Sequence, residues 1–273
     1  MTATTCCIEY DDVRIHVTAI GQGQTVVLLP SLGRDIEDFI PVARILAGHG
    51  CRVLMPAPRG IGLSRGPLAG ITLEDLARDV AEVIRALGDS TTDGKALVAG
   101  HAFGNWVARM AAVAHPELVL GVALLAAAHR NFPASLRDSI DRIMDRTLPS
   151  GERLAHLRQA FFAPGHDASP WLDGWHPEVA RAQREAGRAT PVQAWWAAGD
   201  VPLLDVQAEH DPFAPLSGAD SLRETLGSRV HVALIPGASH ALLPEQPVAV
   251  ADAMIRFLAR LGRITANPKE TPS

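Results

Sequence analysis

The chain has 273 residues, of which 47% are hydrophobic, and its 25 Lys and Arg face 30 Asp and Glu, for a net charge of -5. This length suits one large domain with an insertion, and the apolar content excludes disorder over most of the chain. The acidic balance excludes the basic stripe of nucleic-acid-binding proteins, so no nucleic-acid partner is expected.

No segment of the sequence is expected to enter or cross a membrane. The first residues, MTATTCCIEYDD, contain neither a basic start nor an apolar core of secretory length. No apolar run reaches the about 18 residues that a membrane-spanning helix needs. These features predict a cytoplasmic protein without membrane contact, as a monomer or a homodimer.

Neither a metal site nor a cofactor site is expected. The three cysteines, Cys6, Cys7 and Cys51, fit neither a disulfide framework nor a zinc site. The adjacent pair is interpreted as the two faces of one strand. The segment GQGQ at residues 21–24 does not lead from a strand into a helix, so it does not predict a nucleotide loop.

Apolar strands alternate with amphipathic helices through the first half of the chain. From residue 25 onward, the strand runs have the length of strands that are buried on both faces. This alternation predicts a parallel sheet covered by helices on both sides. The predicted strands are residues 6–10, 13–20, 25–30, 51–58, 95–100 and 119–128.

Helices are predicted between these strands. Apolar residues recur at helical spacing over residues 36–46 and again over residues 73–87. Thr72 is the expected N-cap of the second of these helices, and Asp75 lies three residues after it. Gly88 is expected to end that helix.

The alternation stops near residue 129, and no strand is predicted before residue 200. Strands return over residues 201–211 and 228–240, and a last helix covers residues 247–261. We therefore predict a core of residues 1–129 and 200–262, a helical lid of residues 130–199, and a C-terminal tail of residues 263–273. The helices predicted in the lid are residues 136–143, 154–161, 176–187 and 190–199.

The segment KALVAGHAFGNWVARM, residues 95–110, carries the main functional signal. A buried strand leads into Gly100, and a helical pattern follows Gly104 at once. Strand, Gly-x-x-x-Gly and helix is the sequence form of a nucleophile elbow, which presents a serine at the end of a sheet. The middle position here is Ala102, whose methyl group cannot attack a substrate.

The chain resembles the α/β-hydrolase superfamily over nearly its whole length. The segment LLPSLGR, the Gly100–Gly104 turn, Asp211 and His240 follow the superfamily's order of oxyanion loop, nucleophile, acid and histidine. The resemblance implies a mostly parallel eight-stranded sheet with helices on both faces and a helical lid. The chain departs from the pattern at Ala102 and at Pro30-Ser31, where many relatives have His-Gly. It also resembles bacterial hydrolase-like proteins with the elbow sequence GHAFGN and a tryptophan-rich lid, in which the alanine is native.

The resemblance also implies roles for the site residues. Asp211 would accept the Nδ1 proton of His240 and leave Nε2 as a base. The backbone N–H groups of Leu32 and Phe103 would be the oxyanion donors. Ser31 is interpreted as a residue that stabilises a turn.

The predicted substrate pocket is lined largely by aromatic residues, because most tryptophans of the chain lie in the predicted lid. The alternative is that these tryptophans form the lid's own core. His101 and His210 are interpreted mainly as packing residues behind the site. The predicted pocket residues are Ser31, His101, Trp106, Phe162, Trp171, Trp175, Trp195 and Trp196.

Three functional hypotheses follow from Ala102, since loss of such a nucleophile costs on the order of a million-fold in turnover. The first is an enzyme that uses His240 and Asp211 as a general base on a small apolar carbonyl or ester, by hydrolase, lyase or cofactor-free oxygenase chemistry. The second is a serine hydrolase whose serine at position 102 was replaced in the laboratory. The third is a non-catalytic protein that binds a small apolar ligand.

Overall fold

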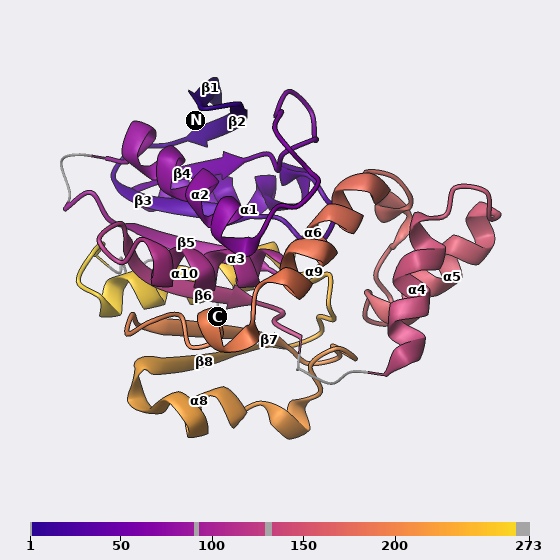
Figure 1. Ribbon diagram of the computed structural model, residues 1–273. Helices are drawn as coiled ribbons and strands as arrows, with labels where there is room; N and C mark the ends of the chain where they lie inside the picture. Colours follow the sequence, from indigo (N-terminus) through magenta and orange to yellow (C-terminus); the bar gives the residue numbers. More distant parts are fainter. Residues whose placement is uncertain (1, 90–92, 129–132, 266–273) are drawn as a thin grey trace.

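A central sheet of eight strands organises the computed structural model, which describes residues 2–89, 93–128 and 133–265 (Figure 1). The strand order is β1-β2-β4-β3-β5-β6-β7-β8. The β1–β2 and β2–β4 pairs are antiparallel, and all other pairs are parallel. The strands are β1 (Thr4–Tyr10), β2 (Val13–Ile20), β3 (Gln24–Leu29), β4 (Cys51–Pro56), β5 (Ala96–His101), β6 (Val119–Leu125), β7 (Leu203–Ala208) and β8 (Val230–Ile235).

Burial along the strands follows their place in the sheet. Every residue of β3 and β5, at the centre, is buried, as the continuous apolar runs predict. Strand β1, at one edge, has no buried residue. The predicted α/β class, with a mostly parallel eight-stranded sheet, is confirmed.

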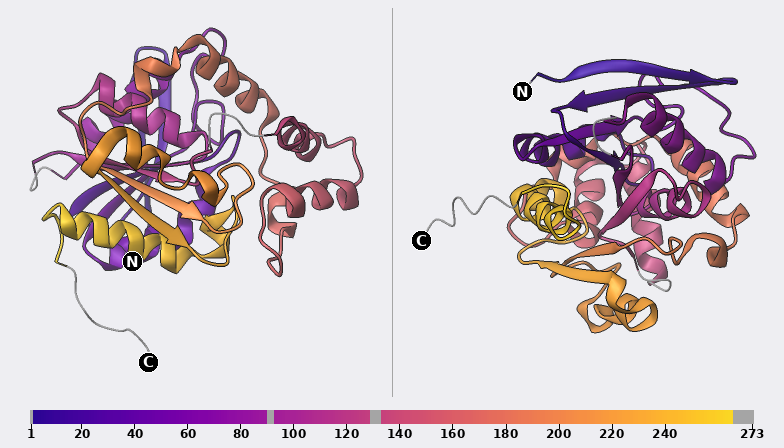
Figure 2. Two further views of the ribbon diagram at one scale, coloured as in Figure 1. Left: turned by 90° about the horizontal axis from the view of Figure 1, so that it is seen from below. Right: turned by 90° about the vertical axis from the view of Figure 1, so that its left-hand side faces the viewer.

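Helices cover both faces of the sheet (Figure 2). One apolar core contains residues of α1 (Ile40–Gly48), α9 (Leu242–Glu245) and α10 (Pro247–Arg260). The other contains residues of α2 (Leu73–Leu87), α3 (Gly104–Ala114) and α8 (Ser221–Leu226). A short 3-10 helix, η1 (Ile36–Phe39), precedes α1 within the span predicted as one helix.

Helix α2 shows how local sequence sets an element's ends. The Thr72 side chain accepts a hydrogen bond from the backbone N–H of Asp75, and the Asp75 carboxylate accepts one from the N–H of Thr72. This reciprocal pair satisfies two N–H groups that have no partner inside the helix. Gly88 follows as the C-cap, so the predicted start and end of this helix are confirmed.

A helical insertion connects β6 to β7. Its α4 and α5 stand apart from the sheet in Figure 1, whereas α6 packs against α2 and α7 packs against α3. The predicted boundary at residues 129 and 130 and the tail residues 266–273 lie outside the described residues. The helices of the insertion are α4 (Ala134–Met144), α5 (Ser150–Ala160), η2 (Ser169–Leu172), α6 (Pro177–Ala189) and α7 (Val192–Trp195).

No helix in the described part of the chain is both long enough and apolar enough to span a bilayer.

Candidate active site

The turn between β5 and α3 is tight because two glycines bring backbone segments into contact. A Cβ at Gly100 would lie 2.2 Å from the backbone carbon of Gly104, and a Cβ at Gly104 would lie 2.3 Å from the carbonyl oxygen of Leu29. Between them, Ala102 has a φ of 47°, in the left-handed region. That conformation costs a non-glycine residue about 1–2 kcal/mol, so packing on both sides must hold it.

Hydrogen bonds fix Ala102 in this conformation. Its N–H donates to the carbonyl of Leu125, 3.0 Å away at the end of β6. Its carbonyl accepts from the backbone N–H of Asn105 at 3.1 Å, and also from the Asn105 side-chain amide. The methyl group at this position therefore occupies a defined place at the carboxyl end of the sheet.

Asp211 and His240 meet on two neighbouring loops at the same end of the sheet. The Nδ1 atom of His240 lies 2.9 Å from Oδ2 of Asp211, and these residues are 4% and 3% exposed. The other carboxylate oxygen accepts the backbone N–H of Phe213 at 2.8 Å, which fixes the carboxyl plane. With the proton on Nδ1 facing the carboxylate, Nε2 is left as the acceptor atom of the ring.

His101 fixes the backbone of His240 from behind. Its ring is fully buried, and its Nε2 lies 2.8 Å from the carbonyl oxygen of His240. Burial, and next the nearby His240 ring, lower the pKa of His101 to about 3. His101 is therefore neutral near pH 7 and donates its Nε2 proton to that carbonyl.

Glu245 joins the His240 loop to the helical insertion. Its carboxylate accepts the backbone N–H of Ser239 at 2.6 Å and that of Ala163 at 2.5 Å. A backbone bond of 2.8 Å from Ala241 to Phe161 runs beside it. Burial raises the pKa of Glu245, and the two N–H donors oppose that rise.

Leu32 and Phe103, whose backbone N–H groups the sequence predicts as oxyanion donors, lie at the carboxyl end of the sheet near Ala102. Both residues line one cavity together with Ala102 and His240. Within the described residues, neither N–H donates to a protein acceptor. Phe103 also directly precedes α3, so its N–H lies at the positive end of a helix dipole.

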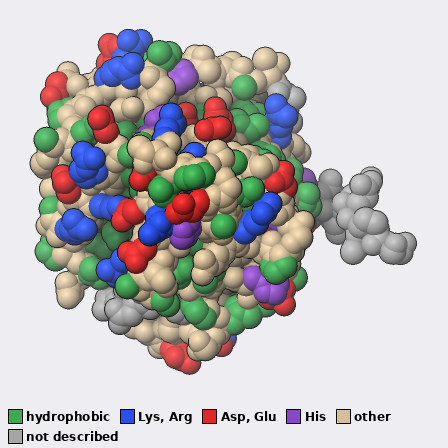
Figure 3. Space-filling model, turned by 90° about the vertical axis from the view of Figure 1, so that its right-hand side faces the viewer, with side chains coloured by type: hydrophobic (Ala, Val, Ile, Leu, Met, Phe, Trp, Pro, Cys, Tyr) green, Lys and Arg blue, Asp and Glu red, His purple; other side chains and the backbone are tan. Residues whose placement is uncertain are grey.

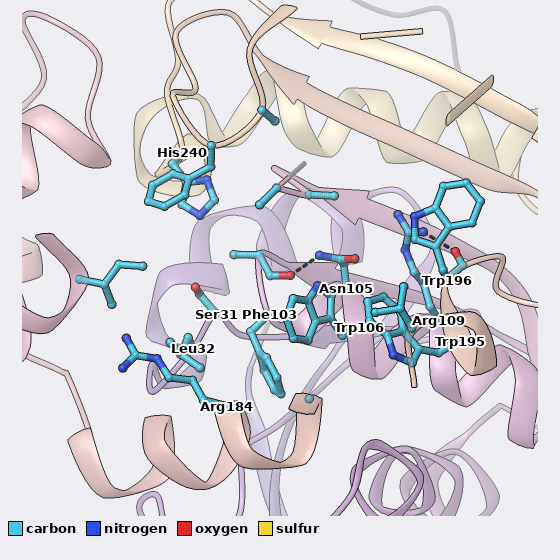
Figure 4. A pocket seen from close by; sticks show the side chains of 18 of the residues that line it. Ser31, Leu32, Phe103, Asn105, Trp106, Arg109, Arg184, Trp195, Trp196 and His240 are labelled. Atoms are coloured by element: carbon cyan, nitrogen blue, oxygen red, sulfur yellow. Dashed lines mark hydrogen bonds between the residues drawn. The ribbon is translucent and has the colours of Figure 1, made fainter. Parts of the chain in front are cut away.

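This cavity has a volume of about 1190 Å³ and lies between the sheet and the insertion (Figure 4). Figure 4 places Ser31, Leu32 and His240 at one end and Arg109 and Trp196 at the other. The sheet domain contributes one wall, and α4, α6 and α7 contribute the other. The aromatic residues of its lining are Phe103, Trp106, Phe161, Trp175, Trp195, Trp196 and Phe213.

Five of the eight predicted pocket residues line the cavity: Ser31, Trp106, Trp175, Trp195 and Trp196.

The other three differ from the prediction, because they lie behind the cavity wall. Trp171 is 2% exposed, and its ring packs against the rings of Phe162 and His101 at centroid distances of 5.3 Å and 6.2 Å. The Arg34 guanidinium covers it at 4.5 Å. The alternative weighed for the tryptophans therefore holds for Trp171, which belongs to the apolar core of the insertion.

The charged and amide residues of the cavity wall were missed by the sequence analysis. They lie on separate helices and on β7, and nothing in their local spacing marks them. The aromatic lining residue Phe213 was also missed. It lies two residues after Asp211, and this proximity to the predicted acid was the one local signal that could have identified it. The missed charged and amide lining residues are Asn105, Arg109, Arg137, Asp141, Arg184, Arg188, Gln193, Asp205 and Gln207.

Among the described residues, no group of three or more His, Cys, Asp or Glu side chains is placed to hold a metal ion.

Curated relatives are hydrolases and related enzymes. A protein of Metapseudomonas resinovorans, 2-hydroxy-6-oxo-6-(2'-aminophenyl)hexa-2,4-dienoic acid hydrolase, is 25% identical over 261 residues, which cover 90% of this chain and 87% of that one. Lipase LipV of Mycobacterium tuberculosis is 28% identical over 186 residues, 68% of this chain and 58% of the lipase. A Mycobacterium phage D29 protein named for non-heme haloperoxidase activity is 30% identical over 118 residues, 43% of this chain.

Several of these alignments span only part of the relatives. The chain covers 41% of the phage protein, and it covers 30% of a dihydrolipoyllysine-residue acetyltransferase component from Cupriavidus necator.

Solved structures match the fold over nearly the whole chain. A serine hydrolase involved in carbazole degradation (CarC enzyme) superposes with a TM-score of 0.74 at 21% identity, covering 95% of this chain and all of that one. A bromoperoxidase from Bacillus anthracis gives 0.72 at 18% identity, covering 94% of this chain and 100% of its own. The sequence model of the family described as "Serine aminopeptidase, S33" matches residues 22–247. The chain therefore belongs to this family of α/β-hydrolase-fold proteins.

Proposed function

We propose that the protein is a hydrolase-type enzyme in which His240, oriented by Asp211, acts as a general base on a carbonyl or ester substrate. The observation that carries the proposal is the 2.9 Å contact between His240 Nδ1 and Asp211 Oδ2 beside the cavity. A buried carboxylate in that position orients the imidazole and stabilises the imidazolium that forms when Nε2 takes a proton.

The alanine at position 102 sets the order of events. A side chain without Oγ leaves room near Nε2 for a water molecule. His240 removes a proton from this water, and the hydroxide attacks the substrate carbonyl carbon directly. The N–H groups of Leu32 and Phe103 stabilise the oxyanion, and the imidazolium then returns its proton to the leaving group. No acyl-enzyme forms in this series of reaction steps.

The relatives support a hydrolytic reaction at a carbonyl group. The relative that aligns over 90% of this chain is named as the hydrolase of an oxo-dienoic acid. Because the relatives' names span lipase, haloperoxidase and hydrolase activities, the reaction assigned here rests on the geometry of the site.

A second candidate, the serine hydrolase with a replaced serine, is favoured by one observation. Ala102 keeps a positive φ of 47° in a turn that would present an Oγ to His240. A serine side chain at this position would need no rebuilding of the turn, because the backbone is already in the conformation that a nucleophile elbow requires.

The Ala102→Ser variant tests whether the site is assembled. We expect it to react with a small fluorophosphonate, since Asp211 and His240 can deprotonate a hydroxyl at that place. The unsubstituted protein is expected not to react, and adding His240→Gln to Ala102→Ser should abolish labelling. A folded Ala102→Ser variant that resists the probe would show that base and oxyanion donors do not act together.

Hydrolysis of a short activated ester separates enzyme from binding protein. We expect the alanine protein to accelerate the reaction above the buffer rate, and His240→Gln to remove about a hundredfold or more of that acceleration. Equal rates for the alanine protein and His240→Gln would favour the binding hypothesis.

A further inference from the structure

The cavity has a charge balance opposite to that of the whole chain. Four arginines and two aspartates line it, whereas the chain carries more acidic than basic residues. Figure 3 looks onto the side of the molecule where α4 and α5 lie, and its positive and negative side chains are interspersed. The cavity wall therefore has an excess of cations that this outer face does not show, and low-dielectric surroundings strengthen its attraction for anions.

Arg184 is the arginine that Figure 4 shows near Ser31 and Leu32, at the His240 end of the cavity. It extends from α6, and its NH1 donates to Oδ1 of Asp141 on α4 at 2.6 Å. Its Nε and NH2 atoms donate to no other group of the described chain. The Arg184 side chain is 31% exposed, and that of Asp141 is 61% exposed.

Arg34 shows what a purely structural arginine does in this protein. Its Nε and NH2 both donate to the Asp38 carboxylate, at 2.9 Å and 2.7 Å, and its NH1 donates to the carbonyl of Asp173 at 2.7 Å. All three guanidinium nitrogens are in use, and the side chain is buried. Arg184 differs because the edge of its guanidinium formed by Nε and NH2 has no acceptor within the described chain.

We propose that Arg184 binds an anionic group of the substrate, a carboxylate, while the reacting carbonyl lies at Ala102 and His240. The planar guanidinium edge matches a carboxylate with two parallel N–H···O bonds. Asp141 holds the arginine in place from its NH1 side and competes weakly for it, since the aspartate is largely in water. This inference rests on the proposed function only for the position of the reacting carbonyl.

The rest of the substrate is assigned by the lining between the two ends. Trp106, Trp175, Trp195 and Trp196 all line the cavity, and the rings of Trp106 and Trp195 stack at a centroid distance of 5.1 Å. Such walls bind flat apolar groups through large contact areas. The ligand class that we propose is therefore an aromatic carboxylic acid, which is larger and more polar than the small apolar compound expected from the sequence.

A matched pair of ligands tests the proposal in the full chain by calorimetry. The probes are 4-phenylbutyrate and 4-phenylbutanamide, which differ mainly in charge. We expect the anion to bind with a Kd at or below the millimolar range and about tenfold more tightly than the amide at low salt. This preference should shrink as the salt concentration rises.

Two substitutions should move the preference in opposite directions. Arg184→Gln should remove it, and Asp141→Asn should increase it because the competing carboxylate is lost. The control is Arg142→Gln: Arg142 also forms an exposed ion pair in the insertion, at 2.8 Å with Glu152, but it does not line the cavity. This control should leave both affinities unchanged.

Several outcomes would overturn the assignment. The first is equal affinity of the unsubstituted protein for the acid and the amide, and the second is no binding of the acid at millimolar concentration. The third is a lower affinity for the acid in Asp141→Asn as well as in Arg184→Gln. If Arg184→Gln fails to fold, the proposal is still tested by the affinities of Asp141→Asn and by the salt dependence of the preference for the acid. The fluorophosphonate test needs no anion, so its result distinguishes failure of this inference from failure of the proposed function.

Discussion

The two walls of the cavity are built in different ways. On the sheet side, buried hydrogen bonds hold Ala102, Asp211 and His240. The Ala102 N–H donates to the Leu125 carbonyl, the Asp211 carboxylate bonds the His240 ring and the Phe213 N–H, and the His240 carbonyl accepts from the His101 ring. On the insertion side, Arg184 and Asp141 meet through a partly exposed ion pair between two helices. The contacts that hold these three residues are buried, whereas the Arg184–Asp141 contact on the insertion side is partly exposed.

On the proposed function, this difference suits separate tasks for the two regions. Catalysis needs its groups fixed before substrate arrives, because reorganisation in the transition state costs rate. Recognition of a charged group can use a side chain such as Arg184, which can bind a substrate carboxylate in place of, or beside, that of Asp141. Glu245 connects the two, since its carboxylate accepts from Ser239 on one side and from Ala163 on the other.

The largest expected effect comes from adding one methyl group to a glycine in the sheet domain and, for comparison, one to a glycine in the insertion. Gly104→Ala places a Cβ 2.3 Å from the Leu29 carbonyl, a contact with backbone that cannot move aside, so we expect a loss of at least about 3 kcal/mol or no folding. Gly151→Ala, in α5, meets nothing within 4 Å and should stabilise the protein by up to about 1 kcal/mol. Urea unfolding measures both.

Equal and small effects of the two glycine substitutions would contradict the difference between the two regions. Because both changes are Gly→Ala in a helix, the comparison removes the propensity contribution that they share.

How well sequence predicted the molecule follows the same division. Strand and helix spans and the Thr72 cap were predictable because their causes are local: apolar period, capping chemistry and turn glycines. The approach of Asp211 to His240 was predictable because the family's chain order fixes it. The Arg184–Asp141 pair joins residues 43 positions apart, so no local sequence pattern predicts it. Trp171 was misplaced for the same reason, since composition does not say which face of an insertion meets the cavity.

A smaller but pH-dependent effect is expected at His101. Its pKa falls from an ordinary 6.5 to about 3 on folding, so below pH 6.5 the unfolded chain binds a proton that the folded chain does not. The stability that depends on a neutral His101 is therefore fully present above pH 6.5 and is lost as the pH falls. This one group should contribute a slope of about 1.4 kcal/mol per pH unit between roughly pH 6 and pH 4.

The variant His101→Gln isolates that contribution. A glutamine amide can still donate to the His240 carbonyl but does not titrate. We expect the free energy of unfolding in urea to depend less on pH in the variant than in the unsubstituted protein, by the amount that one proton contributes. An identical slope in both proteins would show that His101 is protonated in the folded state.

The smallest expected effect tests the joint between the two regions. Glu245→Gln replaces one of two acceptor oxygens with an amide donor that faces a backbone N–H, so we expect a loss of about 1–3 kcal/mol. The matched control is Glu152→Gln, which breaks an exposed ion pair in the insertion and should cost less than about 1 kcal/mol. If Glu245 positions His240, Glu245→Gln should also slow fluorophosphonate labelling in the Ala102→Ser background, and Glu152→Gln should not. Reduced stability with an unchanged labelling rate would mean that Glu245 anchors the insertion without influencing the base. Restoration of the rate by Glu245→Asp would instead assign the effect to the carboxylate itself.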